Sequence, residues 1–213
     1  MKPQLGDTIL NRYTLVSSLR EEPGIQAWKA NDRVLAKDCQ LFIITDRSAF
    51  AAIDKLAGRI AATRPDRVIP ILKYRMESDV LLIVMPVDSG QCLTDYMVDT
   101  AKPLSYSAIR SIIGECADVL REVIADTPSG IVITTDTVRV TTSGVQIADA
   151  PCATMLADTS ATDLRTDGPE RYAIRQLAAL LYTLLTRTPS QATPTFNPVS
   201  YTHLRAHETL MNL

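Results

Sequence analysis

The sequence predicts an α+β fold in which strands come first and helices follow. Short runs rich in branched and aromatic residues dominate the first part of the chain, and Gly, Pro, Asp or charged residues bound each run. Such runs are typical of strands joined by hairpins. Beyond about residue 90 the apolar residues recur at every third or fourth position, which is the period of an amphipathic helix. This change of period indicates a sheet-rich part followed by a helical part.

The first part is expected to hold five strands and one helix. The runs that predict strands are residues 13–19, 25–30, 40–45, 68–74 and 80–86. Between the third and the fourth run, apolar residues at helical spacing predict a helix over residues 50–60, for which Ser48 is the expected N-cap. The expected order is therefore three strands, a helix and two strands.

The second part is expected to hold two long helices with a short hairpin between them. A wide apolar stripe predicts a helix over residues 109–124, and strand-like runs follow at 138–141 and 145–148. The Thr- and Asp-rich stretch 153–168 is predicted to be an exposed loop. It leads into a strongly apolar helix over residues 170–186, whose buried side is expected to carry Ile174, Leu177, Leu181, Leu184 and Leu185.

Composition and charge exclude several kinds of function. The chain has 213 residues, 46% of them hydrophobic, and a net charge of −2, which fits a folded soluble protein and offers no basic surface to a nucleic acid. Its cysteines are scattered without CxxC spacing, so neither a disulfide framework nor a zinc site is expected. Because no apolar run is long enough to cross a bilayer, the segment is expected to lie in the cytoplasm, even if a parent protein carries a membrane anchor elsewhere.

The last residues are interpreted as foreign to the gene. Residues 199–209 resemble one reading frame of a transposase-type sequencing adaptor, so residues 199–213 are left out of the fold prediction as an artefact. Both histidines, His203 and His207, lie in this stretch, and their i, i+4 spacing therefore carries no weight as a metal site. The remaining chain has no histidine, which is the usual general base near neutral pH.

Three stretches of sequence carry a resemblance to a known family. Residues 12–15 (RYTL) with 27–32 (AWKAND) match the two opening strands of a protein kinase. Residues 82–93 match the strand and hinge that grip an adenine, and residues 181–189 (LYTLLTRTP) match the end of the central helix of the larger lobe. By these motifs the chain resembles bacterial eukaryotic-like serine/threonine kinases. It looks closest to the kinase-like domains of actinobacterial proteins linked to the cell-wall lipid flippase.

The resemblance implies a two-lobed protein-kinase-like fold. Residues 1–87 would form an N-lobe of five strands and one helix, and residues 88–198 would form a partial helical C-lobe, truncated after the central helix. Truncation at that point would leave apolar side chains of helix 170–186 without packing partners, and exposed apolar surface of this kind lowers solubility.

The resemblance also places the phosphate-binding positions of a kinase on residues unsuited to them. The three loop glycines fall on Arg20, Glu22 and Ile25, and the lysine of the third strand falls on Phe42. The helix partner of that lysine, a Glu in the family, falls on Lys55. Without the glycines the backbone amides cannot close over a triphosphate, and a phenyl ring cannot supply charge-assisted hydrogen bonds to it.

The catalytic loop departs from the family pattern as well. The HRD motif aligns with residues 133–135, so Thr135 stands in place of the catalytic Asp, and Asp136 follows one position late. The metal-binding Asp of the DFG motif aligns with Asp149, which Ala and Pro follow in place of Phe and Gly. Read without the resemblance, Phe42 is a core aromatic residue, and Asp136 and Asp149 are turn residues.

These positions favour a catalytically inactive, kinase-like module that binds a protein partner and needs no cofactor. The alternative is a divergent serine/threonine kinase that binds ATP and Mg²⁺ through the two Asp residues, with Lys37 or Lys29 as a displaced phosphate-binding lysine. A third possibility is nucleotide binding without catalysis at the hinge, near Met85 and Val87.

The stretch 153–168 indicates how a partner would be recruited. Thr154, Thr159, Thr162 and Thr166 lie among acidic residues there. If an active kinase modified one of them, the phosphothreonine would present a dianion to an arginine-bearing reader domain. The other interpretation is that Thr, Asp and Ser simply form a loop. A role in cell-envelope regulation is implied by the resemblance alone.

Overall fold

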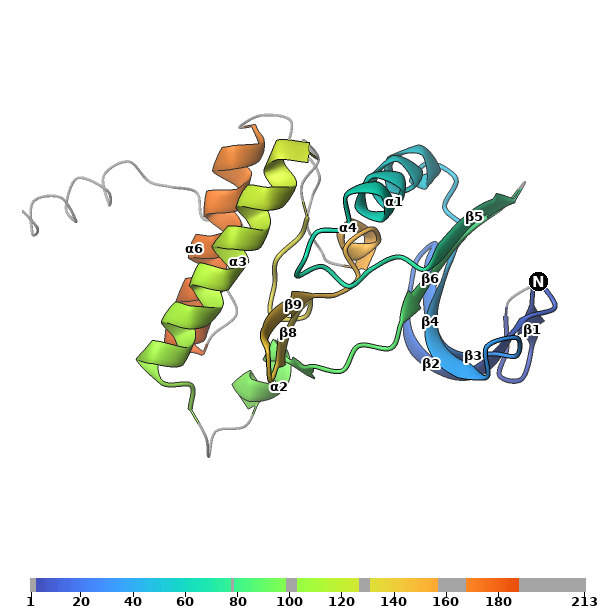
Figure 1. Cartoon of the computed structure of the whole chain (residues 1–213), viewed down its shortest axis with the longest axis horizontal. Helices are drawn as coiled ribbons and strands as arrows, with labels where there is room; N and C mark the ends of the chain where they lie inside the picture. The colour runs from blue at the N-terminus through green and yellow to red at the C-terminus, as the bar shows by residue number, and fades with distance from the viewer. Residues whose placement is uncertain (1–2, 78, 99–102, 127–130, 157–167, 188–213) are drawn as a thin grey trace, which may run out of the picture.

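The computed structural model describes residues 3–77, 79–98, 103–126, 131–156 and 168–187. These residues form two lobes: a curled antiparallel sheet with one helix, and a part built from helices and a small sheet (Figure 1). The predicted α+β, two-lobed architecture is confirmed. Helix α6 is the last helix that the structure describes.

The sheet of the first lobe has six strands and not the five expected. In chain order they are β1 (Thr8–Ile9), β2 (Tyr13–Glu22), β3 (Ile25–Asp32), β4 (Lys37–Ile44), β5 (Lys73–Glu77) and β6 (Val80–Pro86). Neighbours in the sheet follow the order β1-β2-β3-β4-β6-β5, and all pairs are antiparallel. The extra strand arises because the chain before Arg12 turns back and pairs Thr8 and Ile9 with β2.

The two faces of this sheet have separate cores. One face packs against helix α1 (Phe50–Thr63) through a cluster that includes Phe42, Ile44 and Ile83. The opposite face buries a second cluster around Tyr13 and Trp28. Because side chains alternate along a strand, the continuous apolar run of β4 supplies both clusters.

Two local predictions in this lobe are wrong. The run 68–74 was expected to be a strand, but β5 begins only at Lys73. Val68 and Ile69 are buried, yet the backbone here bonds to the other lobe, where the Ile69 N–H donates to the Ile147 carbonyl at 2.9 Å. Ser48 is not the N-cap of α1, because its N–H and hydroxyl both donate to the Asp46 carboxylate at 2.9 and 2.6 Å. Residue Ala49 caps this helix without a side-chain hydrogen bond.

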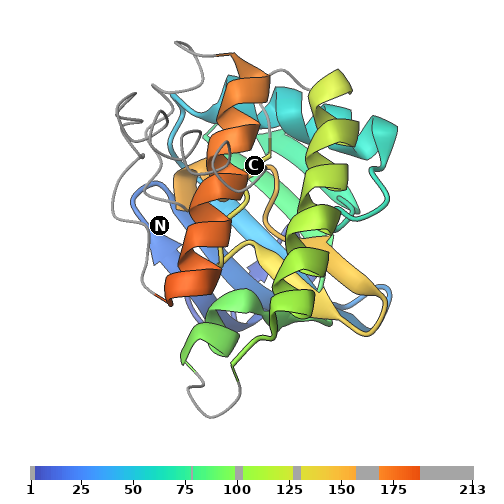
Figure 2. The same cartoon turned by 90° about the vertical axis from the view of Figure 1, so that its left-hand side faces the viewer.

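The second lobe is built around two long helices, α3 (Tyr106–Asp126) and α6 (Pro169–Thr186), which lie side by side (Figure 2). The remaining elements are β7 (Gln91–Cys92), α2 (Leu93–Val98), β8 (Val138–Thr141), β9 (Gly144–Ile147) and α4 (Ala153–Leu156). Strands β7, β8 and β9 form a three-stranded sheet. The stretch predicted as a loop from residue 153 thus begins with a short helix.

The predicted buried side of α6 is only partly correct. Ala173, Leu180 and Leu184 lie in the core that α6 shares with α3, whereas Ile174 and Leu185 are exposed. Leu181 and Tyr182 are exposed as well. Two apolar stripes run along this helix one position apart, and α3 covers only one of them. Several apolar side chains of α6 are therefore exposed among the described residues.

No helix in the described ranges is both long enough and apolar enough to span a membrane.

Candidate functional site

The candidate site lies where the two lobes meet. The first lobe contributes the end of β6, the hinge residues 87–90 and one side of β4. This side belongs to the face of the sheet that packs against α1, which is called the inner face below. From the second lobe come the turn 134–137 and the segment 148–152 that follows β9. Figure 1 shows that the chain after β6 and the segment after β9 lie between the six-stranded sheet and helices α3 and α6.

The inner side of the contact is apolar and centred on Phe42. The register of β4 places Phe42 opposite Ala27 of β3 and Ile83 of β6, on the face that α1 covers. Phe42 is 1% exposed, and its cluster also contains Ala148 and Cys152 from the second lobe. The position that the resemblance assigns to a phosphate-binding lysine thus lies in an apolar cluster to which both lobes contribute.

The α1 position expected to complete a lysine–glutamate pair is turned away from this cluster. Lys55 is exposed, while Ile53, Leu56 and Ala57 around it are buried. Ile53 and Ala57 belong to the same cluster as Phe42. The α1 side chains that pack in the cluster of Phe42 are therefore apolar.

The tip of the β2–β3 hairpin is a tight turn and not an open loop. Glu22 pairs directly with Ile25, and Gly24 turns the chain with a φ of +78°. The Gly24 carbonyl accepts hydrogen bonds from the N–H groups of Thr45 and Asp46 at 2.8 and 3.2 Å. The tip is therefore fastened to the end of β4.

Arg20, the first of the predicted loop positions, lies on the inner face of the sheet. It is paired in register with Ala27, and it forms an ion pair with Glu22 at 3.5 Å. The positive charge of Arg20 acts to lower the pKa of Asp149, which lies in the segment after β9. A cation therefore does face the contact, from β2 and not from β4.

The hinge side of the contact is polar and charged. The Gln40 side-chain amide donates to one Asp88 carboxylate oxygen at 2.8 Å, and Arg139 Nε donates to the other at 2.5 Å. The side chains of Arg139 and Asp88 are only 15% and 17% exposed. Burial lowers the pKa of Arg139, but the hydrogen bond to Asp88 and nearby negative charges outweigh it, so the pKa is raised overall. This network ties β4, the hinge and β8 together.

The other groups of this network come from the second lobe. Arg139 Nη1 donates to the backbone carbonyl of Asp136 and lies 3.3 Å from the Cys92 sulfur. Gly90 packs so closely that an added Cβ would lie 2.7 Å from the Arg139 Cβ. The hinge therefore has no room for a larger residue at position 90.

Asp136 and Thr135 shape a turn. The Asp136 carboxylate accepts a hydrogen bond from the Thr94 hydroxyl at 2.6 Å, and the Thr135 carbonyl accepts one from the Thr94 N–H at 3.1 Å. The N–H of Thr137 closes the turn on the Thr134 carbonyl at 3.2 Å. The Asp136 carboxylate is exposed but already engaged at the start of α2, as expected of a turn residue.

Asp149 is a half-buried acid in a strained backbone position. Its φ is +57°, in the left-handed region that Asp and Asn tolerate better than most residues. Burial raises the pKa of its carboxyl to about 6, with the charge of Arg139 opposing this shift and that of Asp88 adding to it. The structure brings no cluster of three or more potential metal ligands together within the described residues.

Of the two displaced lysines considered, only Lys29 faces the contact. It pairs in register with Gln40, on the same face as Ala27 and Phe42, and its ammonium lies 2.9 Å from Asp38. Lys37 lies one position before Asp38 and points to the opposite face. At the hinge, Met85 is buried beside Gln40.

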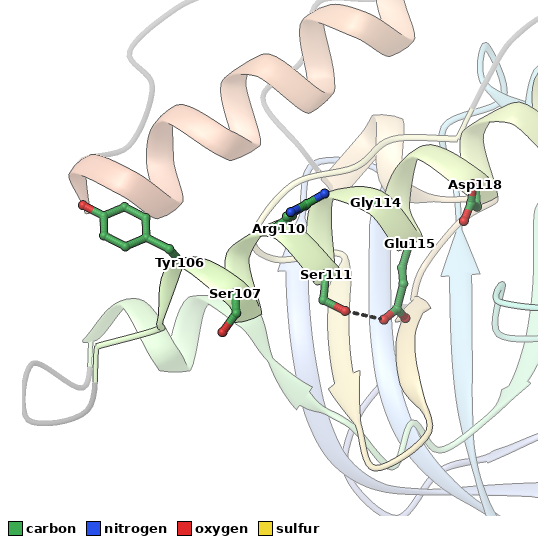
Figure 3. A pocket seen from close by; sticks show the side chains of 7 residues that line it. All are labelled: Tyr106, Ser107, Arg110, Ser111, Gly114, Glu115 and Asp118. Carbon is green, nitrogen blue, oxygen red and sulfur yellow. Dashed lines mark hydrogen bonds between the residues drawn. The ribbon is translucent and has the colours of Figure 1, made fainter.

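A hollow of about 600 Å³ lies elsewhere, on the exposed side of α3 (Figure 3). It forms over Gly114, between Tyr106 and Asp118. The Glu115 carboxylate in this hollow already has partners. It accepts hydrogen bonds from the Ser111 hydroxyl at 3.1 Å and from the Val145 N–H at 2.7 Å, and it forms an ion pair with Arg67. This hollow is not part of the interlobe site.

The predicted phosphosites are not placed by the structure. Thr159, Thr162 and Thr166 lie outside the described residues, as do residues 199–213, and the side chain of Thr154 is not described either. The Gln40–Asp88–Arg139 network was not predicted from the sequence. A signal existed, because Gln40 and Arg139 are single polar residues inside apolar strand runs.

Comparison with known proteins identifies the fold. No protein-family model matches the sequence, and no curated protein matches it. Among solved structures, the chain is similar to the kinase domain of PknI from M. tuberculosis, with a TM-score of 0.69 and 15% sequence identity over 92% of this chain and 81% of that one. At this identity the similarity shows the fold alone: the chain has a protein-kinase-like fold.

Proposed function

We propose that this chain is a pseudokinase, a kinase-like module without phosphotransfer activity that acts by binding a protein partner. The observation that carries this proposal is the burial of Phe42 in the cluster that joins the lobes. A triphosphate would need a cation and amide donors at this place, because phosphoryl transfer depends on neutralising the phosphates and orienting the nucleophile. The protein places a phenyl ring and a buried thiol there instead.

Three further observations support the same proposal. The hairpin tip is fastened by the Gly24 carbonyl and cannot close over a nucleotide as a free loop. The carboxylate of Asp136 is engaged by Thr94. On the hinge side, Arg139 and Asp88 already satisfy each other, and a nucleotide would have to compete with that ion pair.

Transfer of radiolabelled γ-phosphate from ATP tests the proposal. The purified chain is incubated with Mg-ATP and a general protein substrate, beside an active bacterial serine/threonine kinase as positive control. We expect no incorporation above that of a sample without enzyme. A Phe42→Leu variant, which keeps the cluster apolar, serves as the matched variant. Incorporation by the wild-type chain that changes in this variant would overturn the proposal.

A divergent kinase that binds ATP and Mg²⁺ is the second candidate. Two observations favour it: Lys29 and Arg20 both lie on the inner face of the sheet, and Asp149 follows β9 as a metal-binding Asp would. This candidate predicts that Lys29→Met abolishes a measurable Mg-ATP-dependent stabilisation. Stabilisation by ATP without phosphate transfer would instead indicate a nucleotide-binding module.

We further propose that the partner recognises phosphothreonine in the stretch 153–168, in a cytoplasmic, cell-envelope-related role. The support is the sequence pattern of Thr and acidic residues and the resemblance to flippase-linked kinase-like domains. Mass spectrometry after incubation with an active kinase from the same cell tests it. Modified Thr154, Thr159, Thr162 or Thr166 would be expected, and four unmodified threonines would end the proposal.

A further inference from the structure

One edge of the six-stranded sheet is open. Strand β5 ends the strand order, and all five of its residues are exposed. No described strand pairs with its outer edge, and Figure 1 shows it at the border of the lobe, away from α3 and α6. Such an edge presents unpaired N–H and C=O groups to any strand that can align with them.

The side chains of β5 divide into an apolar and a charged face. Tyr74 and Met76 lie opposite Ile83 and Leu81 of β6, on the inner face of the sheet, and both remain 40% or more exposed. Lys73, Arg75 and Glu77 therefore lie on the other face. On this face Lys73 and Arg75 are positively charged and Glu77 is negatively charged.

We propose that β5 pairs with β5 of a second copy of this chain, antiparallel and about a two-fold axis at Arg75. In that register Lys73 of each copy lies opposite Glu77 of the other, and Tyr74 lies opposite Met76. One contact then makes two opposite-charge pairs and two sulfur–aromatic pairs, because a two-fold interface uses every contact twice. The two six-stranded sheets become one continuous sheet.

The charge pattern selects this register and this partner. In a parallel in-register pairing, each charged residue would face its own kind. At the two-fold axis Arg75 does meet Arg75, but Glu77 of the same chain already lies 3.1 Å from each guanidinium and offsets its charge. Charged edges discourage pairing with unrelated strands. The opposite edge, β1, has only two residues and offers no comparable contact.

The inference is independent of whether the chain transfers phosphate. Sedimentation equilibrium of the full chain over a concentration series tests it directly. We expect a monomer–dimer equilibrium. Lys73→Glu and Glu77→Lys should each raise the dimer Kd by about tenfold or more, since two attractive pairs become repulsive.

The decisive arm is an equimolar mixture of the two variants. Each heterodimer then has opposite charges across both pairs, so the mixture should associate about as well as the wild type. Arg33→Glu is the matched control, because it makes the same charge change on the exposed β3–β4 turn and should leave the Kd unchanged. All three positions are exposed, so cooperative melting should be retained in every sample.

Three results would overturn the inference. The wild type could remain monomeric at every concentration. A dimer could form that neither variant weakens, which would point to the exposed stripe of α6. The mixture could associate no better than either variant alone, which would show that Lys73 and Glu77 do not face each other.

Discussion

The two sides of the interlobe contact can be compared residue by residue. On the inner side, Phe42 packs with Ala148 and Cys152 in an apolar cluster. On the hinge side, Asp88 joins Gln40 to Arg139 by hydrogen bonds and charge. Burial of apolar surface is non-directional, whereas the charged network depends on geometry and on keeping every partner satisfied. The lobes of this chain are thus connected in two different ways.

The inner side should show the largest effect on stability. Phe42→Ala leaves a cavity between the lobes, and we expect it to lower the free energy of unfolding by about 3–5 kcal/mol. Urea denaturation followed by circular dichroism measures this loss. Val87→Ala, at an exposed hinge position, is the control and should stay within about 0.5 kcal/mol of wild type. A loss at Phe42 as small as the control would mean that the inner side is not packed as described.

The hinge side should follow with a somewhat smaller loss. Arg139→Leu leaves the Asp88 carboxylate partly buried without its cation, and we expect a loss of about 3 kcal/mol. Arg121→Leu removes an arginine of an exposed pair with Asp118 and should cost less than about 1 kcal/mol. If the two variants lost the same stability in urea denaturation, the network would be no more than a surface ion pair.

Asp149 makes the contact sensitive to pH. Because the folded-state pKa, about 6, lies above the ordinary value of 3.8, the native state binds more protons between these two values. Stability attributable to this group is therefore full below pH ~4 and is lost as the pH rises to ~6. Asp149→Asn removes the ionisation and keeps a residue that tolerates the left-handed backbone.

Denaturation of wild type and Asp149→Asn across pH 3–8 measures this effect. Above pH ~6 the variant should be more stable by on the order of 3 kcal/mol, and below pH ~4 the two should converge. Asp32 does not interfere, because its hydrogen bond from Arg12 lowers its pKa to about 2, and its contribution is lost only below pH ~4. If the free energies of unfolding of wild type and variant differed by the same amount at every pH, the pKa of Asp149 would not be raised in the folded protein.

The smallest effect is expected at Lys29. Its pair with Asp38 is partly exposed, so Lys29→Met should change the free energy of unfolding by less than about 1 kcal/mol. The same variant should leave the response to Mg-ATP unchanged if the chain does not hold phosphate there. A nucleotide-dependent difference between wild type and variant in thermal unfolding would favour the divergent-kinase alternative.

Local sequence patterns predicted the elements whose position depends on their own residues and not on contacts with the other lobe. Strand β6 lies at residues 80–86 as expected, because it is buried on both faces and reads as an unbroken apolar run. Helix α6 begins one residue before its predicted start, since Pro169 fits the first turn of a helix. Phe42 was correctly interpreted as a core aromatic residue.

Features that depend on the other lobe could not be predicted from local patterns. Val68 and Ile69 are β-branched residues typical of a strand, and both are buried. Their backbone, however, pairs with Ile147 of the other lobe, far along the chain. The buried stripe of α6 was ambiguous because two apolar stripes adjoin, and only the position of α3 selects one. The Gln40–Asp88–Arg139 network joins residues about 50 positions apart, and no spacing rule brings them together.

The free energy of unfolding of the wild-type chain, measured with and without saturating Mg-ATP, tests most directly whether side chains fill the interlobe contact. A ligand that binds only the native state stabilises it by about 2.7 kcal/mol at one hundred times its Kd. If Phe42, Ala148 and Cys152 fill the place where phosphates would bind, the two urea curves should coincide. A stabilisation of that size would show that Mg-ATP binds the native chain.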